Sequence, residues 1–532
     1  MATPSETIVP TGGATPVSVL RTSLRRARLL TPTFGDLQFL SVLVWIFAVG
    51  PAAWSRLLVD ADAGWHIRTG QWILQNASVP RTDFYSFTKP GQEWFAWEWL
   101  AEIILGGLFL AGGLKAVVLL SAILVAAFGA LIFQHAVWRG ANVFIALPLV
   151  LMAVGASTVH ALARPHLWTM AFFALSWFLI DRDRRSPSLA IWWLVPLGAA
   201  WTNLHGGFLA LPVMLGLVAA GSALEAWFGE RCWKPTKRYA ILAAATAAVS
   251  LINPYGWRLH LHVRDLMQTQ WVKDVVSEWM SPTFRNEQML LFEILLLAGM
   301  AVSGWLISRR RFVEPLLLVF WAHSALGSAR HLTLYCAAAV PVIAAALAEL
   351  WDMWTRKASR NSTPAILADM ARSAQPSLSR ISVWAILPLV AIAFIGQPLR
   401  WPQDFPAEIF PVEMIDQNVN SVKGLRVFTT DQWADYLLFR FYPDQRVFLD
   451  GRCDFYGEHL GKEYLSLLNG APDWSRILDK YQFDTVLIPA DRSLGSLLKL
   501  CPDWRLLADD GKRLLFRRIG PGPESRKTRS AA

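Results

Sequence analysis

Apolar residues run in long blocks along the first three quarters of the chain, separated by short polar and basic stretches. Each block is about 17–23 residues long, the length of helix that crosses the hydrocarbon core of a bilayer. The stretches 141–158 and 331–348, for example, contain no Asp, Glu, Lys or Arg. Helices are expected because lipid offers no water to pair with backbone N–H and C=O groups. The pattern therefore predicts a mainly α, polytopic helical transmembrane protein.

The blocks predict about eleven spans in a transmembrane domain at 37–398. The stretch 98–112 is short for a span and contains Glu98 and Glu102, so we expect it to be interfacial or re-entrant. With that choice and the N-terminus inside, Lys and Arg concentrate in the inner segments, as the positive-inside rule requires. Residues 1–36 then form a disordered, basic cytoplasmic tail, and the first outer loop is 56–113. The predicted spans are 37–55, 114–135, 141–160, 165–180, 189–204, 206–228, 239–255, 289–307, 313–329, 331–350 and 382–398.

The chain changes character at about residue 399, where apolar runs shorten to strand length. Strands are predicted at Leu425–Phe428, Val447–Leu449, Thr485–Ile488 and Leu514–Phe516, and helices at 431–441, 456–468, 473–481 and 493–500. This alternation indicates a small α/β domain at 399–519, followed by a disordered tail at 520–532. Eleven crossings place the domain outside a bacterial cell membrane, in the periplasm or the exterior. The linker 357–380 is expected to be a flexible inner loop.

Composition supports the membrane prediction and narrows the partners. Hydrophobic residues make up 54% of the chain and charged residues 17%, whereas soluble proteins carry about 25% charged residues. The net charge of +10 resides largely in short loops, where basic residues set topology. The charge therefore does not indicate nucleic-acid binding, and membrane lipid is the expected partner.

The first outer loop holds the densest candidate chemistry. Asp60 and Asp62 follow the first span, and WHIRTGQWIL after them has the spacing of an amphipathic helix. A second helix is predicted at 94–104, with Glu98 and Glu102 one turn apart. A carboxylate pair can act as a general base toward a hydroxyl, or hold a divalent cation such as Mg or Mn that grips phosphate. Asp60 and Asp62 are the candidate catalytic residues, and the cofactor stays open.

Further polar motifs fall on the same face, among them ARPH (163–166), NLHGG (203–207), NPYGWRLHLH (253–262) and SARH (328–331). Guanidinium groups at helix ends can fork onto a phosphate. Each residue alone is more often a satisfied interfacial residue, but their gathering on one face favours a shared site. The candidate substrate-binding residues are His66, Arg68, Glu98, Arg164, His166, Asn203, His205, Arg258, His260, Arg330 and His331.

The long first loop with Asp60-Ala-Asp62, its two interfacial helices, the many spans and the outer tail domain together resemble the GT-C superfamily of membrane glycosyltransferases. The resemblance implies transfer of a sugar from a polyprenyl-phosphate donor to a cell-envelope acceptor at the outer face. It also implies that the acidic residues of the first loop supply the base or the metal ligand. Asp431-Gln-Trp433-Ala-Asp435 faintly echoes the Trp-Trp-Asp motif of the oligosaccharyltransferase branch.

Alternatives remain at this point. A transporter or flippase would place its site near the midplane on broken helices, whereas few ionisable residues fall mid-span here. A catalytically silent protein of envelope assembly is a third reading. FLDGRCDFYG (448–457) either contacts the acceptor or is a turn in which Arg452 pairs with Asp454. Cys453 and Cys501 share the outer domain, where oxidising conditions allow a disulfide.

Overall fold

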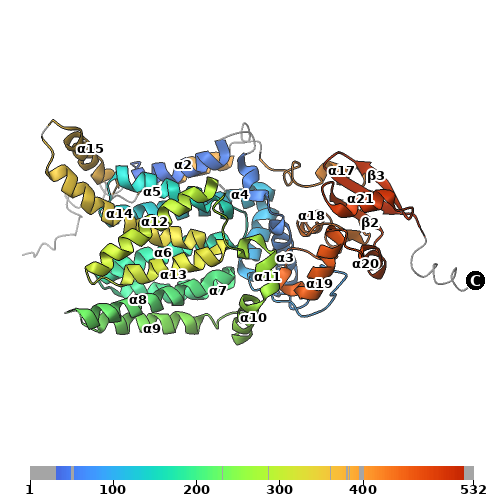
Figure 1. Ribbon diagram of the computed structural model, residues 1–532, viewed down its shortest axis with the longest axis horizontal. Coiled ribbons are helices and arrows are strands. Elements are labelled where there is room, and N and C mark those ends of the chain that lie inside the picture. The colour runs from blue at the N-terminus through green and yellow to red at the C-terminus, as the bar shows by residue number, and fades with distance from the viewer. Residues whose placement is uncertain are drawn as a thin grey trace, which may run out of the picture.

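Most of the chain is a bundle of helices, with a small α/β domain at one end (Figure 1). This computed structural model describes residues 31–48, 53–229, 232–285, 287–359, 361–378, 382, 384–394 and 401–520. The predicted tails at 1–36 and 520–532 therefore lie almost entirely outside the described residues. The end of the last predicted span, 382–398, also lies outside them.

Helices form where the apolar blocks predicted them. In the bundle they are α2 (Phe34–Ala48), α4 (Trp99–Trp138), α5 (Val143–Ala156), α6 (His166–Arg185), α7 (Leu194–Leu204), α8 (Ala210–Phe228), α9 (Lys234–Val249), α12 (Glu287–Ser308), α13 (Val313–Gly327), α14 (Leu332–Arg356) and α16 (Ile386–Phe394). Among the described residues, five helical segments are long and apolar enough to cross a membrane, and three more are apolar but shorter. The chain is a multi-pass membrane protein, and the count of eleven spans stays a prediction.

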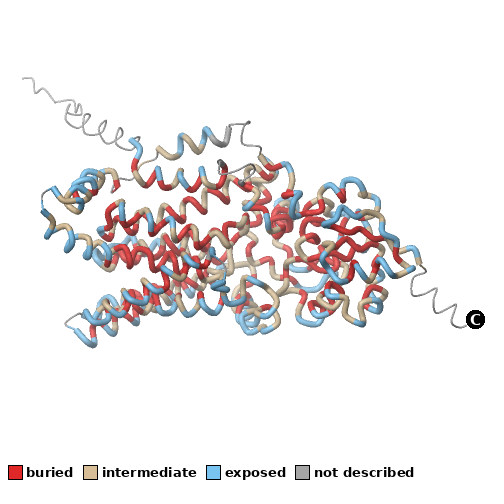
Figure 2. The backbone as a smooth tube through the Cα atoms, turned by 45° about the horizontal axis from the view of Figure 1, so that its top comes forward, coloured by how far each residue is buried: buried red, intermediate tan, exposed pale blue. Residues whose placement is uncertain are grey.

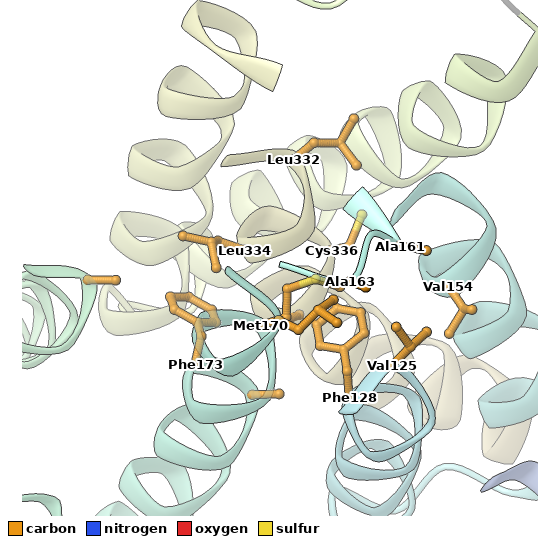
Figure 3. Packing of buried hydrophobic residues seen from close by; sticks show 14 of the residues in the cluster. Val125, Phe128, Val154, Ala161, Ala163, Met170, Phe173, Leu332, Leu334 and Cys336 are labelled. Atoms are coloured by element: carbon orange, nitrogen blue, oxygen red, sulfur yellow. The ribbon is translucent and has the colours of Figure 1, made fainter. Parts of the chain in front are cut away.

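The bundle is packed tightly beneath the end that faces the tail domain. Figure 2 shows buried residues running through both the bundle and the tail domain. In Figure 3, Phe128 of α4, Met170 and Phe173 of α6 and Leu334 of α14 interdigitate. All four side chains are at most 4% exposed. This packing holds the helices in fixed positions relative to one another.

The stretch 98–112 does not continue straight into the following span. Within α4 the helix breaks at Gly112 and Gly113, and Gly113 has φ 62° and ψ −159°. The segment before the break packs against α3 (Asp62–Asn76), as an interfacial segment would. The second interfacial helix was predicted at 94–104, but it begins only at Trp99. Residues 94–98 are not helical because Trp94 N donates to Arg81 O and Ala96 N donates to the Tyr255 hydroxyl.

The tail domain is α/β, as predicted, but its sheet differs in detail. Its strands are β1 (Val427–Phe428), β2 (Thr485–Pro489), β3 (Trp504–Asp509) and β4 (Arg513–Arg518), in the order β1-β2-β4-β3. Its helices are α17 (Val412–Gln417), α18 (Asp431–Phe441), α19 (Cys453–Leu468), α20 (Trp474–Lys480) and α21 (Ser493–Leu500). The pair β1 and β2 is parallel, and the other pairs are antiparallel.

Two predictions about this half of the chain are wrong. The segment Val447–Leu449 is not a strand of the sheet, because its backbone pairs with Tyr85–Phe87 of the first loop instead. The linker 357–380 is not a loop throughout: it contains α15 (Thr363–Leu378), whose buried Ala368, Ala371 and Leu378 recur at helical spacing. No disulfide joins Cys453 and Cys501, a bridge that their shared domain had left open.

Candidate active site

A cavity of about 890 Å³ lies where the bundle meets the tail domain. In Figure 1, α3, α11 (Gln270–Val275), α18 and α19 gather at this junction. Its walls come from the first loop, from the segments that link α5 to α6, α7 to α8 and α13 to α14, and from the tail domain. The cavity therefore collects loops from one end of the bundle.

Asp60 and Asp62 reach the cavity because the chain turns into α3 between them. The backbone N–H of Asp62, which begins α3, donates to Asp60 Oδ1 at 3.0 Å. Arg164, just before α6, donates from Nη1 to Asp60 Oδ2 at 2.7 Å, and its Nη2 lies 2.9 Å from Asp62 Oδ2. The same guanidinium lies 3.7 Å from Glu278 Oε1. One cation thus faces three carboxylates. Burial lowers the pKa of Arg164, but the carboxylates outweigh this effect and hold the pKa above its ordinary value.

The residues present do not fit a divalent cation at this position. The place between Asp60 and Asp62 is taken by the Arg164 guanidinium, which already bridges both carboxylates. No group of three or more His, Cys, Asp or Glu side chains with the arrangement of a metal site occurs among the described residues. Divalent cations such as Mg²⁺ need several oxygen ligands around one point. No step below therefore passes through a metal ion.

Arg330 is the second guanidinium in the cavity wall, and it is held less completely than Arg164. Its Nη2 is 3.7 Å from Glu278 Oε1, which is too long for a hydrogen bond. The guanidinium carbon lies 4.4 Å from the centre of the Trp279 ring. The side chain is 26% exposed. Arg330 can therefore offer its N–H groups to an anion that enters the cavity.

Four titratable side chains stand in a row along another wall. Glu98 directly precedes α4, and its two carboxyl oxygens lie 3.5 Å from His205 Nε2 and 3.6 Å from His66 Nε2. His66 Nδ1 in turn lies 3.4 Å from Glu102 Oε1. His205 Nδ1 accepts from Gly207 N at 3.0 Å, so its proton belongs on Nε2, toward Glu98.

Burial is the main influence on the pKa values of Glu98, His66 and His205. It raises the pKa of Glu98 to about 7. It lowers the pKa of His66, with Arg164 as the next cause, and that of His205, with Arg330 as the next cause. Both imidazoles are therefore neutral near pH 7, when Glu98 is poised between its charged and uncharged forms.

Two further predicted histidines line the cavity. His166 Nε2 donates to His160 O at 2.7 Å, and His331 Nδ1 donates to Ser324 O at 3.2 Å. Each bond fixes one ring nitrogen and leaves the other to face the cavity or its wall. The predicted residues that the structure brings into the cavity are Asp60, Asp62, His66, Glu98, Arg164, His166, His205, Arg330 and His331.

The other four predicted residues lie outside the cavity lining. Arg68 bonds to Phe439 O, and Asn203 accepts from Trp99 Nε1 at 2.7 Å, so both join helices together. Arg258, on α10 (Trp257–Gln268), pairs with Glu93 at 2.6 Å on the surface. His260 Nε2 bonds to Ser250 Oγ at 2.8 Å.

The tail domain adds residues that were not predicted as part of the site. Buried Arg452 donates to Asp450 Oδ2 at 2.6 Å and to Asp83 Oδ1 of the first loop at 2.7 Å. It does not pair with Asp454, which bonds to His262 at 3.0 Å. The charged residues of FLDGRCDFYG mark this segment as a candidate for the site. The sequence does not indicate that Arg452 pairs with Asp83, because the two residues are 369 positions apart.

A carboxyl of the tail domain also touches the first loop. Asp435 of α18 lies beside Asp62, so close that a Cβ on Gly451 would meet an oxygen of each carboxyl. The carboxyl oxygens of Asp435 accept from Gly451 N at 3.1 and 3.2 Å. Gln432 accepts from Ala61 N at 2.8 Å and donates to Asp62 Oδ1 at 3.4 Å. The position of Asp62 is therefore set from both domains.

Comparisons with known proteins bear on the fold. No protein-family model matches the chain, and no curated protein matches it. Among solved structures, the archaeal oligosaccharyltransferase AglB from Archaeoglobus fulgidus, in complex with an inhibitory peptide and a dolichol-phosphate, is similar with a TM-score of 0.51 and 12% identity. The likeness covers 88% of this chain and 70% of that chain. ArnT from Cupriavidus metallidurans, bound to undecaprenyl phosphate, gives a TM-score of 0.48 and 14% identity over 91% of this chain and 98% of that chain. The likeness to AglB shows that the chain shares the fold of this oligosaccharyltransferase.

Proposed function

We propose that this protein transfers a sugar from a polyprenyl-phosphate donor to a hydroxyl acceptor of the cell envelope, at the outer face of a bacterial cell membrane. The observation that carries the proposal is a cavity that joins the guanidinium groups of Arg164, Arg330 and Arg452 and several carboxylates to an apolar wall. Met170, Val213, Phe320 and Leu334 of the bundle form part of that wall. A lipid phosphate complements such a cavity, because its anionic head can contact the guanidinium groups and its apolar chain can contact the apolar wall.

The residues suggest distinct roles in such a transfer. Asp60 is the more exposed member of the acidic pair, 14% against 7% for Asp62, so we assign it the contact with the acceptor. The acceptor hydroxyl gives its proton to Asp60 while its oxygen bonds to the anomeric carbon of the sugar. The bond from that carbon to the phosphate breaks, and its electron pair leaves with the polyprenyl phosphate. Arg330 binds the phosphate before and after this step.

The comparison with AglB supports the donor class and nothing finer, because that structure contains a dolichol-phosphate. The sidedness rests on the charge of the inner segments. Lys and Arg concentrate in the segments opposite the cavity, including the one that contains α15. That distribution favours a cytoplasmic inner end and an outer tail domain.

The test is transfer of a labelled sugar from polyprenyl phosphate by the purified protein in liposomes. Wild type is expected to transfer. Arg330→Ala should raise the KM for the donor by about tenfold or more, with a smaller effect on kcat, because a phosphate contact acts in the ground state too. Arg258→Ala is the matched control, since this arginine pairs with Glu93 outside the cavity.

Two results would count against the proposal. Equal donor KM values for wild type and Arg330→Ala would remove the phosphate role of Arg330. A wild-type protein that transfers no sugar but moves a solute across the liposome membrane would replace the enzyme with a transporter.

A further inference from the structure

Asp435 belongs to the tail domain and does not line the cavity, yet it contacts Asp62 of the first outer loop directly. Asp435 is fully buried, and the side chain of Asp62 is 7% exposed. Two carboxyl groups that share a buried contact cannot both be ionised without a large cost, so one proton lies between them. The question is which group carries the proton.

The partners of each oxygen answer this question. Asp62 Oδ2 faces the Arg164 guanidinium at 2.9 Å, and Asp62 Oδ1 accepts from Gln432 Nε2 at 3.4 Å. Asp62 is therefore surrounded by donors, as a carboxylate is. Asp435 has the Gly451 N–H and the Asp62 carboxylate as its polar contacts in the part of the chain that the structure describes. A neutral acid satisfies both, because its carbonyl oxygen accepts from Gly451 and its O–H donates to Asp62.

Burial raises the pKa of both carboxyls, that of Asp62 to about 8 and that of Asp435 well above its ordinary value. At Asp62 the facing guanidinium of Arg164 opposes this rise, although Asp60 and Glu278 add to it. Arg164 therefore makes Asp62 the first of the two carboxyls to lose its proton. Asp450 faces Asp435 from the tail domain and raises its pKa further, in addition to the effect of burial and of Asp62. Gly451 is needed at this point because a Cβ there would lie 2.2 Å from Asp62 Oδ1 and 2.8 Å from Asp435 Oδ2.

We propose that Asp435 is a positioning residue that donates a hydrogen bond, as a neutral acid, to Asp62. Through Asp62 it fixes Arg164, and through Arg164 it fixes Asp60. The tail domain then completes the active site of the bundle, although Asp435 does not touch substrate. This inference rests on the proposed sugar transfer only for its kinetic test.

Two substitutions of Asp435 test whether the side chain is needed as a hydrogen-bond donor or only to fill space. In Asp435→Asn the amide oxygen can accept from Gly451 and the amide N–H can donate to Asp62, so kcat should stay within about threefold of wild type. Asp435→Leu has similar volume and no donor, so kcat should fall by about tenfold or more, with the donor KM less affected. Asp62→Asn should lower kcat like Asp435→Leu, because Arg164 loses a carboxylate partner.

The opposite pattern would overturn the assignment. If Asp62→Asn keeps its kcat and Asp435→Asn loses it, the proton resides on Asp62. If Asp435→Asn and Asp435→Leu fall equally, Asp435 acts through its charge and not as a neutral donor.

A second measurement does not depend on any activity. Hydrogen exchange of the Gly451 amide reports its bond to Asp435. Slow exchange is expected in wild type and Asp435→Asn, and exchange at least about tenfold faster in Asp435→Leu. If wild type transfers no sugar but this pattern holds, the proposed function fails and the contact stands. Equal exchange rates in all three proteins would refute the contact itself.

Discussion

Glu98 is a buried carboxyl between two neutral imidazoles, and its environment makes it sensitive to pH. Burial raises its pKa from an ordinary value of 4.5 to about 7. The folded protein therefore keeps a proton on Glu98 at pH values where the unfolded chain has lost it. A group with a raised pKa contributes stability that is fully present below the unfolded value and is lost as the pH rises through the folded value.

The free energy of unfolding should therefore fall between about pH 4.5 and pH 7, by about 3 kcal/mol from Glu98 alone. Glu98→Gln cannot ionise, so its thermal midpoint in detergent should decline less steeply over this range than that of wild type. Glu93→Gln is the matched control, because Glu93 is exposed and pairs with Arg258. Parallel curves for wild type and Glu98→Gln would show that Glu98 does not titrate in this window.

At the scale of residues, sequence reasoning named nine of the polar residues that line the cavity but did not predict which of them pair with one another. Asp60, Asp62, Arg164 and Arg330 could be predicted because each is a charged residue at an outer end of an apolar block. Arg258 shows the same signal, yet the structure places it on the surface, since which face of α10 is exposed depends on tertiary packing. The roles of the cavity residues stay proposals until they are tested.

At the scale of elements, the site depends on the close crossing of α3 and α4. A Cβ on Gly70 would lie 1.7 Å from Glu102 O, and one on Gly106 would lie 2.6 Å from Gln71 N. The absence of side chains at these two glycines lets the backbones of the helices touch. This contact brings His66 of α3 beside Glu102 of α4.

Gly106→Ala should force the two helices apart. Overpacking typically costs about 1–3 kcal/mol, so the thermal midpoint should drop, and sugar transfer should drop with it because α3 carries Asp62. Gly107→Ala is the matched control, since its Cβ would lie 3.8 Å from Leu74 Cδ1, an ordinary contact. A Gly106→Ala protein as stable as Gly107→Ala would mean that the crossing tolerates separation.

The elements were predictable where a local pattern specifies them. Long apolar blocks gave the bundle helices, and alternating short runs gave the α/β character of the tail domain. Strand β3 was missed because its sequence, WRLLAD, lacks a clear alternation and lies at the exposed edge of the sheet. Val447–Leu449 has the sequence of a strand, but its partner is the first loop, which no local pattern indicates.

At the scale of the whole molecule, the bundle and the tail domain are joined through the candidate site. Arg452 bonds to Asp83, and Asp435 bonds to Asp62, so two buried polar contacts cross the junction. Both link residues about 370 positions apart. Sequence reasoning placed the cavity residues and the tail domain on the same side of the membrane, but it could not show that the tail domain forms one wall of the site.

The most direct test of this account is the structure of the protein determined in a lipid nanodisc with polyprenyl phosphate. The account predicts the phosphate within hydrogen-bonding distance of Arg330 and its chain against Met170 and Leu334. It also predicts a bilayer that surrounds the bundle, with the tail domain and α15 on opposite sides (Figure 1). A phosphate bound instead among the basic residues at the other end, such as Arg184 and Arg238, would contradict it. So would a bilayer whose midplane passes through the cavity.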